Sequence, residues 1–383
     1  MEENKNNRIL FVTNFCPHHR IETFEIMSQK LNVEFIFFSE GKEKYWQSEH
    51  GVKKGNFRNR YLSGFYIGNT RITPFLPILL LFKKYDTIIK CINGKFALPI
   101  TFLIAKIRKK PFILWTGVWM RIDTNLHKII FPFTKFIYKY SSAIVVYGNH
   151  VKNYLISEGI ESNKIIIAHH AVNNSDFNME LSEEVKSEFR KKLKIEENKK
   201  IILFLGRLEI EKGLNFLIDA FYELKREDTV LLIAGTGSEI ENLKKKVSNY
   251  QIDERVIFAG YISNKEAVNY YAIAYVYVLP SITTKTVKET WGLVINEAFN
   301  QKLPVIVSES VGAAAGNFVE DGVNGFIVPE RNSIALKEAL AKLLNNAELR
   351  NQMGNNALEK VSKWDNHYMV QGFINAVNFV KIK

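Results

Sequence analysis

The chain has 383 residues, of which 46% are apolar and 24% are charged, and its formal net charge is +12 at pH 7. This length exceeds what one ordinary hydrophobic core uses, so we expect two domains of roughly 150–200 residues each. No apolar run reaches the ~18 residues that a membrane-spanning helix needs, and Cys16 and Cys91 are too few for a disulfide framework. With a polar start that lacks a signal-peptide core, these features favour a reduced, cytoplasmic protein over a membrane-spanning or secreted one.

Short β-branched runs alternate with amphipathic stretches along the chain, which is the pattern of doubly wound parallel sheets. In the first half we predict strands at 9–13, 33–38, 87–92, 112–116, 143–147 and 164–168. In the second half we predict strands at 201–205, 230–234, 256–259, 275–279, 305–308 and 326–328. Predicted helices cover 214–226, 239–249, 264–272, 293–300, 333–345 and 347–363.

The stretch 176–199 is polar, highly charged and without an apolar strand, so we predict that it connects two Rossmann-like domains. The N-terminal domain then covers 1–175 and the C-terminal domain 200–363, with a cleft between them. A last helix in 364–383 is expected to pack back toward the N-terminal domain. Ligands of open α/β sheets bind at the carboxyl ends of the strands, so the loops after the strands are where to look for a site.

Candidate acceptor-binding residues follow two strands of the first half. His18, His19 and Arg20 come after the first strand and could bind an acceptor or a phosphate, or could belong to a surface loop. Trp115 and Trp119 lie at and after the strand 112–116. Their rings could stack on an acceptor sugar, which we favour, or pack in the core.

The segment 83–139 concentrates the positive charge, with twelve Lys and Arg against two Asp. It also holds bulky apolar groups, and the combination suits a surface that sits among anionic lipid headgroups. The alternative is a core with a solvated basic face. Nucleic acid is not expected as a partner, because no recognisable binding module accompanies the charge.

Two loops of the second half carry the chemistry of a phosphate site. After the strand 201–205 comes the loop 206–213, in which Gly206 permits a close backbone approach and Arg207 and Lys212 place two cations beside a helix N-terminus. This pattern favours a diphosphate, although it is not a P-loop. The loop 235–239 has a Gly-x-Gly but not the third glycine of a dinucleotide fingerprint, so we interpret it as a turn, with Ser238 as a possible helix cap.

Two carboxylates, Glu289 and Glu297, stand eight positions apart around the start of the helix 293–300. An ionised carboxylate only accepts hydrogen bonds and can take two sugar hydroxyls at once, so this pair suits a sugar nucleotide. The Tyr261 ring, in the loop after the strand 256–259, could hold a flat base or could equally serve in packing. No Cys/His cluster has the spacing of metal ligands, so we expect no metal and no cofactor.

With these motifs in place, the second half resembles the retaining glycosyltransferases of family 4, the group 1 glycosyl transferases, which have the GT-B architecture of two Rossmann-like domains. The resemblance covers the C-terminal domain from Gly206-Arg207-Leu208 to Asn324-Gly325-Phe326, with five loop motifs in the family's order. The first half departs from the family pattern, because the loop 14–22 lacks the usual glycine pair.

The resemblance implies a role for each motif residue. Arg207 and Lys212 would hold the donor diphosphate, Glu289 would contact the donor sugar, and Glu297 would accept from the ribose hydroxyls. The remaining donor-binding candidates are Gly206, Tyr261, Ile262, Thr290, Trp291, Gly292 and Leu293, with the backbone of 290–293 facing the sugar and phosphate. We expect catalysis with Glu289, Arg207 and Lys212, retention of anomeric configuration, and no metal.

The leading hypothesis is therefore a transferase that uses a nucleotide sugar, with UDP preferred and GDP not excluded. Its acceptor would be a glycan or lipid-linked molecule at the inner face of the cell membrane, in surface polysaccharide or glycolipid synthesis. A GT-B nucleotide-sugar epimerase and a non-catalytic nucleotide-sugar-binding subunit are the alternatives. The sequence alone does not identify the sugar, the linkage or the oligomeric state.

Overall fold

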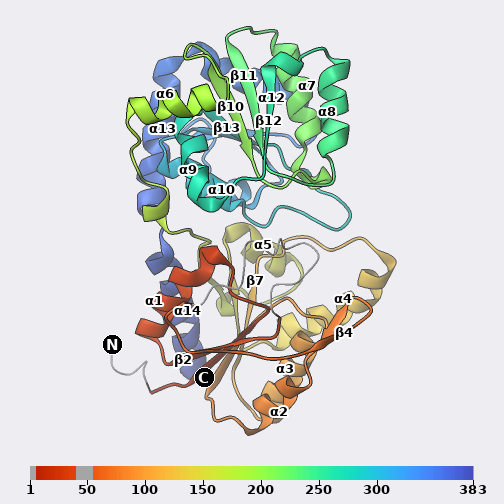
Figure 1. The fold of residues 1–383 in the computed structure, drawn as a ribbon. Coiled ribbons are helices and arrows are strands. Elements are labelled where there is room, and N and C mark those ends of the chain that lie inside the picture. Colours follow the sequence, from red (N-terminus) through yellow and green to blue (C-terminus); the bar gives the residue numbers. More distant parts are fainter. Residues whose placement is uncertain (1–5, 40–54, 383) are drawn as a thin grey trace. The chain divides into compact units, whose positions relative to one another are not determined.

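The computed structural model describes residues 6–39 and 55–382, and its chain is drawn in Figure 1. The chain forms two compact units. The first unit comprises Met1–Val118, Asn125–His170 and Asn366–Lys383, and the second comprises Trp119–Thr124 and Ala171–Asp365. The second unit is therefore continuous in sequence except for six residues that lie inside the span of the first.

The first unit is built on a seven-stranded parallel sheet. In spatial order its strands are β3 (Asn59–Tyr61), β2 (Val33–Phe37), β1 (Ile9–Thr13), β6 (Thr87–Cys91), β7 (Phe112–Thr116), β8 (Ala143–Val146) and β9 (Ile165–Ile167). The inner strands β1, β6, β7 and β8 are buried along their whole length. Helices on both faces of a parallel sheet explain why these strands are continuous apolar runs rather than alternating ones.

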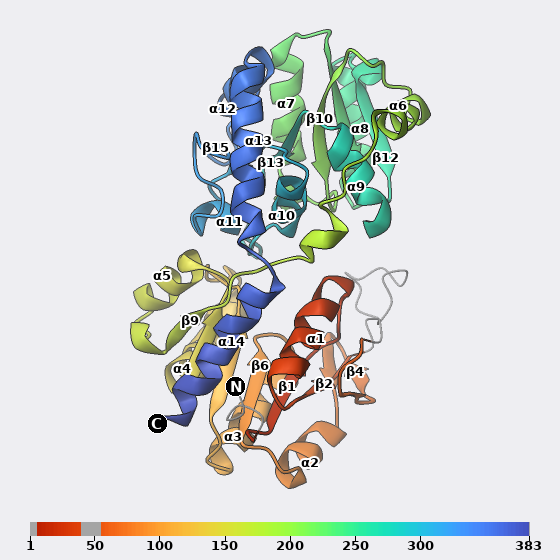
Figure 2. The same cartoon turned by 90° about the vertical axis from the view of Figure 1, so that its left-hand side faces the viewer.

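Among the described residues, six α-helices and a small hairpin complete the first unit. They are α1 (Ile21–Lys30), the β4–β5 hairpin (Phe65–Ile67, Thr70–Ile72), α2 (Phe75–Phe82), α3 (Ala97–Ile107), α4 (Asn125–Tyr140), α5 (Asn149–Ser157) and α14 (Asn366–Lys381). The last helix packs beside α1 and against β8 and β9 (Figure 2). Its Phe373 ring lies 5.9 Å from Phe11 and 5.3 Å from Trp115, centroid to centroid, so the end of the chain fills the core of the first unit.

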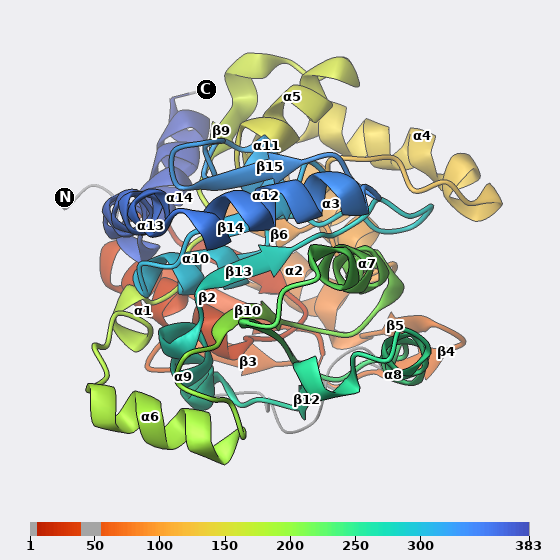
Figure 3. The same cartoon turned by 90° about the horizontal axis from the view of Figure 1, so that it is seen from above.

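The second unit has a six-stranded parallel sheet (Figure 3). Its strands are, in spatial order, β12 (Val256–Gly260), β11 (Thr229–Ala234), β10 (Lys200–Leu205), β13 (Val276–Leu279), β14 (Val305–Ser308) and β15 (Gly325–Val328). Its helices are α6 (Glu183–Lys192), α7 (Leu214–Leu224), α8 (Ile240–Asn249), α9 (Asn264–Ile273), α10 (Leu293–Asn300), α11 (Gly312–Ala315), α12 (Ser333–Asn345) and α13 (Ala347–Ser362).

The predicted α/β architecture with two parallel sheets is confirmed. Every predicted strand is present with ends that differ by at most one residue, and every predicted helix has ends that differ by at most two. The stretch 176–199 differs from a plain connection, because it contains α6, which begins where the Ser182 hydroxyl accepts from the Val185 N–H. The Phe189 ring of α6 packs edge-on against Tyr270 of α9 at 4.9 Å, so this charged stretch is a packed part of the second unit.

No helix among the described residues combines the length and the apolar character needed to cross a bilayer.

Candidate functional site

The candidate site lies in the second unit, where loops from neighbouring parallel strands meet at the carboxyl edge of the sheet. The loop after β10 is joined to the loop after β11 by hydrogen bonds from the Gly206 N–H to the Ala234 carbonyl (2.9 Å) and from the Leu208 N–H to the Thr236 carbonyl (2.9 Å). It is joined to the loop after β13 by a bond from the Ile282 N–H to the Glu211 carbonyl (2.8 Å). The backbones of these three loops are thus joined to one another by hydrogen bonds.

Two glycines make this close approach possible. Gly213 has φ +67°, and a Cβ there would lie 2.0 Å from the carbonyl oxygen of Pro280. Gly235 has φ +136°, and a Cβ there would lie 1.8 Å from the carbonyl oxygen of Gly206. Both positions therefore exclude a side chain on steric grounds and on backbone conformation.

An ion pair joins two of the predicted catalytic residues at this edge. The Lys212 ammonium donates to the Glu289 carboxylate, and the Ser281 hydroxyl donates to the same carboxylate oxygen at 3.4 Å. Both charged side chains are largely buried. Burial raises the pKa of Glu289. The charge and hydrogen bond of Lys212, together with Arg207 and Ser281, lower the pKa by a larger amount, so it lies below its ordinary value. Glu289 is therefore ionised at neutral pH.

The second predicted cation, Arg207, remains largely open to solvent. Its guanidinium donates to the Glu211 carboxylate at 3.1 Å, and 57% of its side chain is exposed. An exposed pair of this kind contributes little to stability. The Arg207 side chain can therefore turn toward an anionic ligand at small cost.

Glu297, the second predicted carboxylate, lies one turn into α10 and contacts a tyrosine. The buried Tyr271 hydroxyl donates to its carboxylate at 2.7 Å. Burial raises the pKa of Glu297, the Tyr271 hydrogen bond offsets part of this shift, and the pKa lies at about 7. Just below neutral pH, Glu297 is therefore protonated, whereas Glu289, which has Lys212 beside it, is ionised.

The backbone between the two carboxylates forms the start of α10. Gly292 is the N-cap with φ +91°, and the first N–H groups of any helix have no partner within the helix. The Trp291 side chain turns inward, with 1% exposure, and stacks against Trp364 at 5.9 Å. Of the predicted residues 290–293, Trp291 can thus offer a ligand only its backbone, while Thr290 is exposed.

Tyr261 and Ile262 follow β12 at the same edge of the sheet. Gly260 turns the chain there with φ +71°, and Tyr261 is exposed while Ile262 is half-buried. The contact of Tyr261 and Ile262 with a base stays a prediction. In the neighbouring loop, the Ser238 hydroxyl donates to Glu209 at 2.7 Å and does not cap α8, whose N-cap is Glu239.

The acceptor candidates of the first half divide into buried and accessible groups. Arg20 is buried, and its guanidinium donates to the His170 imidazole and lies 4.8 Å from the centre of the Trp115 ring. His18 and His19 are half-buried in the short turn before α1. Burial lowers the pKa of His19, and Arg20 and His18 lower it further, so this imidazole is neutral at pH 7.

Trp115 corrects our preference for an acceptor wall at that position. Its side chain is 6% exposed in β7 and packs against Phe11, Tyr147 and Phe373, which is the core alternative that the sequence left open. Trp119 belongs to the second unit instead, where its indole N–H donates to the Glu289 carbonyl at 2.9 Å.

Sequence reasoning did not identify Ser281 and Tyr271 as partners of the two carboxylates. Ser281 follows β13 almost directly, and a hydroxyl at a strand end is a signal that could have found it. Tyr271 lies inside α9 among other apolar residues, and no local pattern distinguishes it from core packing. Within residues 6–39 and 55–382, no group of three or more His, Cys, Asp or Glu is arranged to hold a metal ion.

Comparison with known proteins agrees with this geometry. Residues 185–360 match the family model described as glycosyl transferases group 1. The chain is 31% identical over 207 residues to an uncharacterized glycosyltransferase, MJ1607, of Methanocaldococcus jannaschii, which covers 53% of this chain and 51% of that protein. It is 33% identical over 169 residues to the phosphatidyl-myo-inositol mannosyltransferase of Mycobacterium leprae, covering 43% of each. The aligned parts thus span about half or less of these relatives.

Among solved structures, Anabaena Alr3699/HepE in complex with UDP superposes with a TM-score of 0.78 at 18% sequence identity, covering 97% of this chain and 99% of that one. This similarity establishes the GT-B fold. The family model covers somewhat less than half of the chain, so the match shows that residues 185–360 are similar to the group 1 glycosyl transferases.

The raised pKa of Glu297 predicts that the free energy of unfolding depends on pH. The neutral substitution Glu297→Gln should remove this dependence. The folded state favours the protonated acid, so its contribution to the free energy of unfolding is full below pH ~4.5 and is lost as pH rises through about 7. Relative to Glu297→Gln, the wild type should lose up to about 3 kcal/mol between pH 4.5 and pH 8, since one pKa unit corresponds to ~1.4 kcal/mol. Urea unfolding of both proteins across this range measures the difference, and parallel curves would contradict it.

Proposed function

We propose that this GT-B protein belongs to the group 1 glycosyltransferases and transfers a sugar from a nucleotide-sugar donor to a glycan or lipid-linked acceptor. The observation that carries the proposal is the ion pair between Lys212 and Glu289, beside Arg207 and the N-terminus of α10. Cations and helix N–H groups bind a diphosphate, and an ionised carboxylate accepts sugar hydroxyls. The second unit supplies both within neighbouring loops.

The proposed chemistry follows from where charge develops. As the bond between the anomeric carbon and the diphosphate breaks, the sugar gains oxocarbenium character and negative charge grows on the leaving phosphate oxygens. Arg207, Lys212 and the first N–H groups of α10 stabilise that negative charge, which lowers the barrier. Glu289 orients the donor sugar through its hydroxyls, and retention of anomeric configuration is part of the proposal.

We propose that the nucleoside binds at the same carboxyl edge of the sheet, near α10 and the loop after β12. Glu297 accepts hydrogen bonds from the ribose hydroxyls, and Tyr261 and Ile262 border the base. UDP is the preferred nucleotide, supported by the UDP complex of the structurally similar Anabaena protein. Ribose binding favours ionised Glu297, since a protonated acid has less acceptor capacity.

The first unit offers a surface suited to a membrane-bound acceptor. One face of α4 exposes six large apolar side chains at helical spacing, with lysines between them: Leu126, Ile129, Ile130, Phe133, Phe136 and Tyr140. Phe136 contacts Phe102 of α3 at 6.0 Å, and Arg108 after α3 donates to the last carbonyls of α2, so the three helices adjoin. Apolar groups beside cations bind an anionic lipid surface by burial and by charge together.

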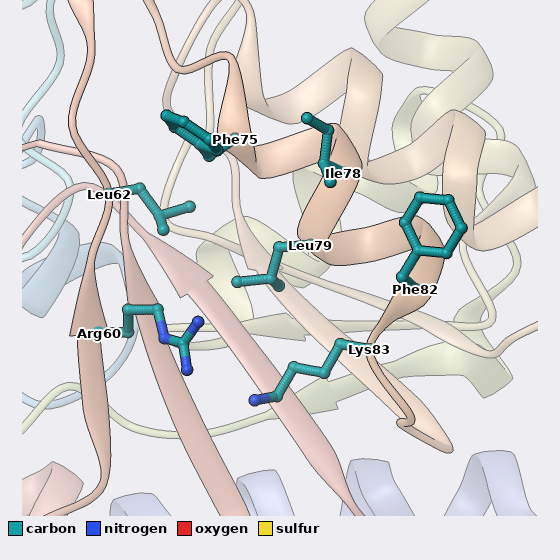
Figure 4. A pocket seen from close by; sticks show the side chains of 7 residues that line it. All are labelled: Arg60, Leu62, Phe75, Ile78, Leu79, Phe82 and Lys83. Atoms are coloured by element: carbon teal, nitrogen blue, oxygen red, sulfur yellow. The ribbon is translucent and has the colours of Figure 1, made fainter.

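The first unit also has a groove of about 480 Å³ between β3 and α2. Figure 4 shows the charged ends of Arg60 and Lys83 on one side of the groove and the apolar side chains of Phe75 and Ile78 on the other. Phe82 at its end is 80% exposed. We propose that this face holds the protein at the inner surface of the cell membrane, which fits a lipid acceptor such as the one named for the Mycobacterium leprae relative.

Donor turnover tests the proposal directly. The protein is incubated with UDP-sugars and GDP-sugars, with and without lipid and glycan acceptors, and nucleoside diphosphate release is measured. We expect release that depends on an acceptor and that Glu289→Ala abolishes without loss of the fold by circular dichroism. Epimerisation without acceptor would support the epimerase alternative, and tight donor binding without turnover would support a non-catalytic subunit.

Lys212 predicts a separate effect on nucleotide affinity. Lys212→Met removes a charge-assisted hydrogen bond to the diphosphate, so UDP binding should weaken by about 1.5–3 kcal/mol, which calorimetry measures. Lys244→Met is the matched control, because Lys244 lies on the exposed face of α8 and pairs only with Glu241 in its own helix among the contacts described. Equal UDP affinity in both variants would remove Lys212 from the diphosphate site.

Vesicle binding tests the membrane surface. Ile129, 78% exposed on α4, becomes Ser in one variant, and Ile334, 63% exposed on α12 of the second unit, becomes Ser in the control. We expect flotation with vesicles that contain anionic lipid, weaker binding at high salt, and a loss in Ile129→Ser that Ile334→Ser does not show. Equal flotation of the two variants would refute α4 as the contact.

A further inference from the structure

Residues Trp119–Thr124 form a short segment whose neighbours in sequence on both sides belong to the first unit, although the segment itself belongs to the second. Two of its hydrogen bonds are made with the loop between β13 and α10, which contains Glu289. The Asp123 N–H donates to the Lys285 carbonyl at 2.7 Å, and the Trp119 indole N–H donates to the Glu289 carbonyl at 2.9 Å. The segment thus binds the catalytic loop in its middle and at its catalytic residue.

The face of the Trp119 ring makes a second contact with the same loop. The Lys288 ammonium lies 3.7 Å from the ring centroid, which is within cation–π distance. Lys288 is the residue directly before Glu289. Two consecutive residues of the loop therefore contact the indole, Lys288 through its ammonium group and Glu289 through its backbone carbonyl. An indole N–H between two such contacts has little freedom to turn.

Glu289 is consequently fixed at both of its ends. Its carbonyl accepts from Trp119 and from the Gly312 N–H at 3.1 Å. Its carboxylate accepts from Lys212 and Ser281. The neighbouring residues Lys285, Thr286, Val287 and Thr290 are exposed, so core packing does not hold this part of the loop. A side chain on such a loop points in one direction only when hydrogen bonds hold its backbone.

We propose that Trp119 is a positioning residue, whose indole N–H fixes the backbone at Glu289 and thereby aims the carboxylate at the hydroxyls of the donor sugar. The proposal rests on the proposed function. It assigns Trp119 to the donor side of the reaction rather than to the acceptor wall that the sequence favoured. Because Glu289 contacts the sugar and not the diphosphate, loss of this hydrogen bond should affect the sugar nucleotide more than the nucleotide alone.

The test compares Trp119→Phe with wild type for binding of UDP and UDP-glucose, and for turnover of that donor or of the nucleotide sugar that the panel identifies. The phenylalanine ring keeps a face for Lys288 but has no N–H donor. We expect kcat to fall about three- to tenfold and affinity for the sugar nucleotide to fall by a similar factor, the scale of one hydrogen bond. Affinity for UDP should stay within twofold of wild type, a split that a loosened or misfolded loop would not give.

Two variants make the outcome unambiguous. Tyr250→Phe is the matched control, because it removes a donor to Asp219 (2.6 Å) on the α7 and α8 side of the same unit and should leave all three measurements unchanged. Glu289→Gln separates this inference from the proposed function. If Glu289→Gln impairs turnover while Trp119→Phe behaves as wild type, or if Trp119→Phe loses UDP binding equally, the positioning role is refuted. If neither variant changes turnover, the proposed role of Glu289 fails as well.

Discussion

A carboxylate that leaves water needs a cation or several donors beside it, and the Lys212–Glu289 pair meets this requirement at the edge of the second sheet. The pair joins the loop after β10 to the loop after β13, so the loops that would hold a diphosphate and a sugar are connected through one interaction. Gly213, next to Lys212, has to pass against the Pro280 carbonyl for the pair to form. The chemistry of the site and its backbone geometry therefore depend on the same contact.

The first unit treats buried charge in a different way. Its buried Lys90 donates to the carbonyls of Cys91 and Asn93 at 2.7 Å each, and burial lowers the pKa of Lys90 to about 7. Its buried Arg20 is held by His170, by the Met369 sulfur and by the face of Trp115. Lys212 has a carboxylate as its partner, whereas Lys90 is held by backbone carbonyls and Arg20 by a neutral imidazole and an aromatic ring.

The sheets could be predicted from the sequence because buried parallel strands have one signal, a short β-branched run, and each run is separated from the next by a turn. Loop motifs likewise brought Arg207, Lys212, Glu289 and Glu297 to one edge, since carboxyl ends of parallel strands share that edge. The sequence could not predict contacts that depend on the direction in which a side chain points, as opposed to the place of its residue along the chain. Trp115 and Trp119 are four residues apart around one strand end, yet one ring packs in the core of the first unit and the other binds a carbonyl in the second. Likewise, only the fold shows that the charged stretch 176–199 contains a helix that packs by Phe189.

The return of α14 to the first unit has a consequence for synthesis of the chain. Phe373 contacts Phe11 and Trp115, so the core of the first unit contains residues that are far apart in the sequence. On the ribosome, the segment from Ala171 to Asp365 is made before this last helix appears, and it can collapse into its own sheet while the first unit still lacks a wall. The first unit must wait, with part of its apolar sheet uncovered, until α14 leaves the exit tunnel. The order in which the two units complete is thus the reverse of the order in which they begin.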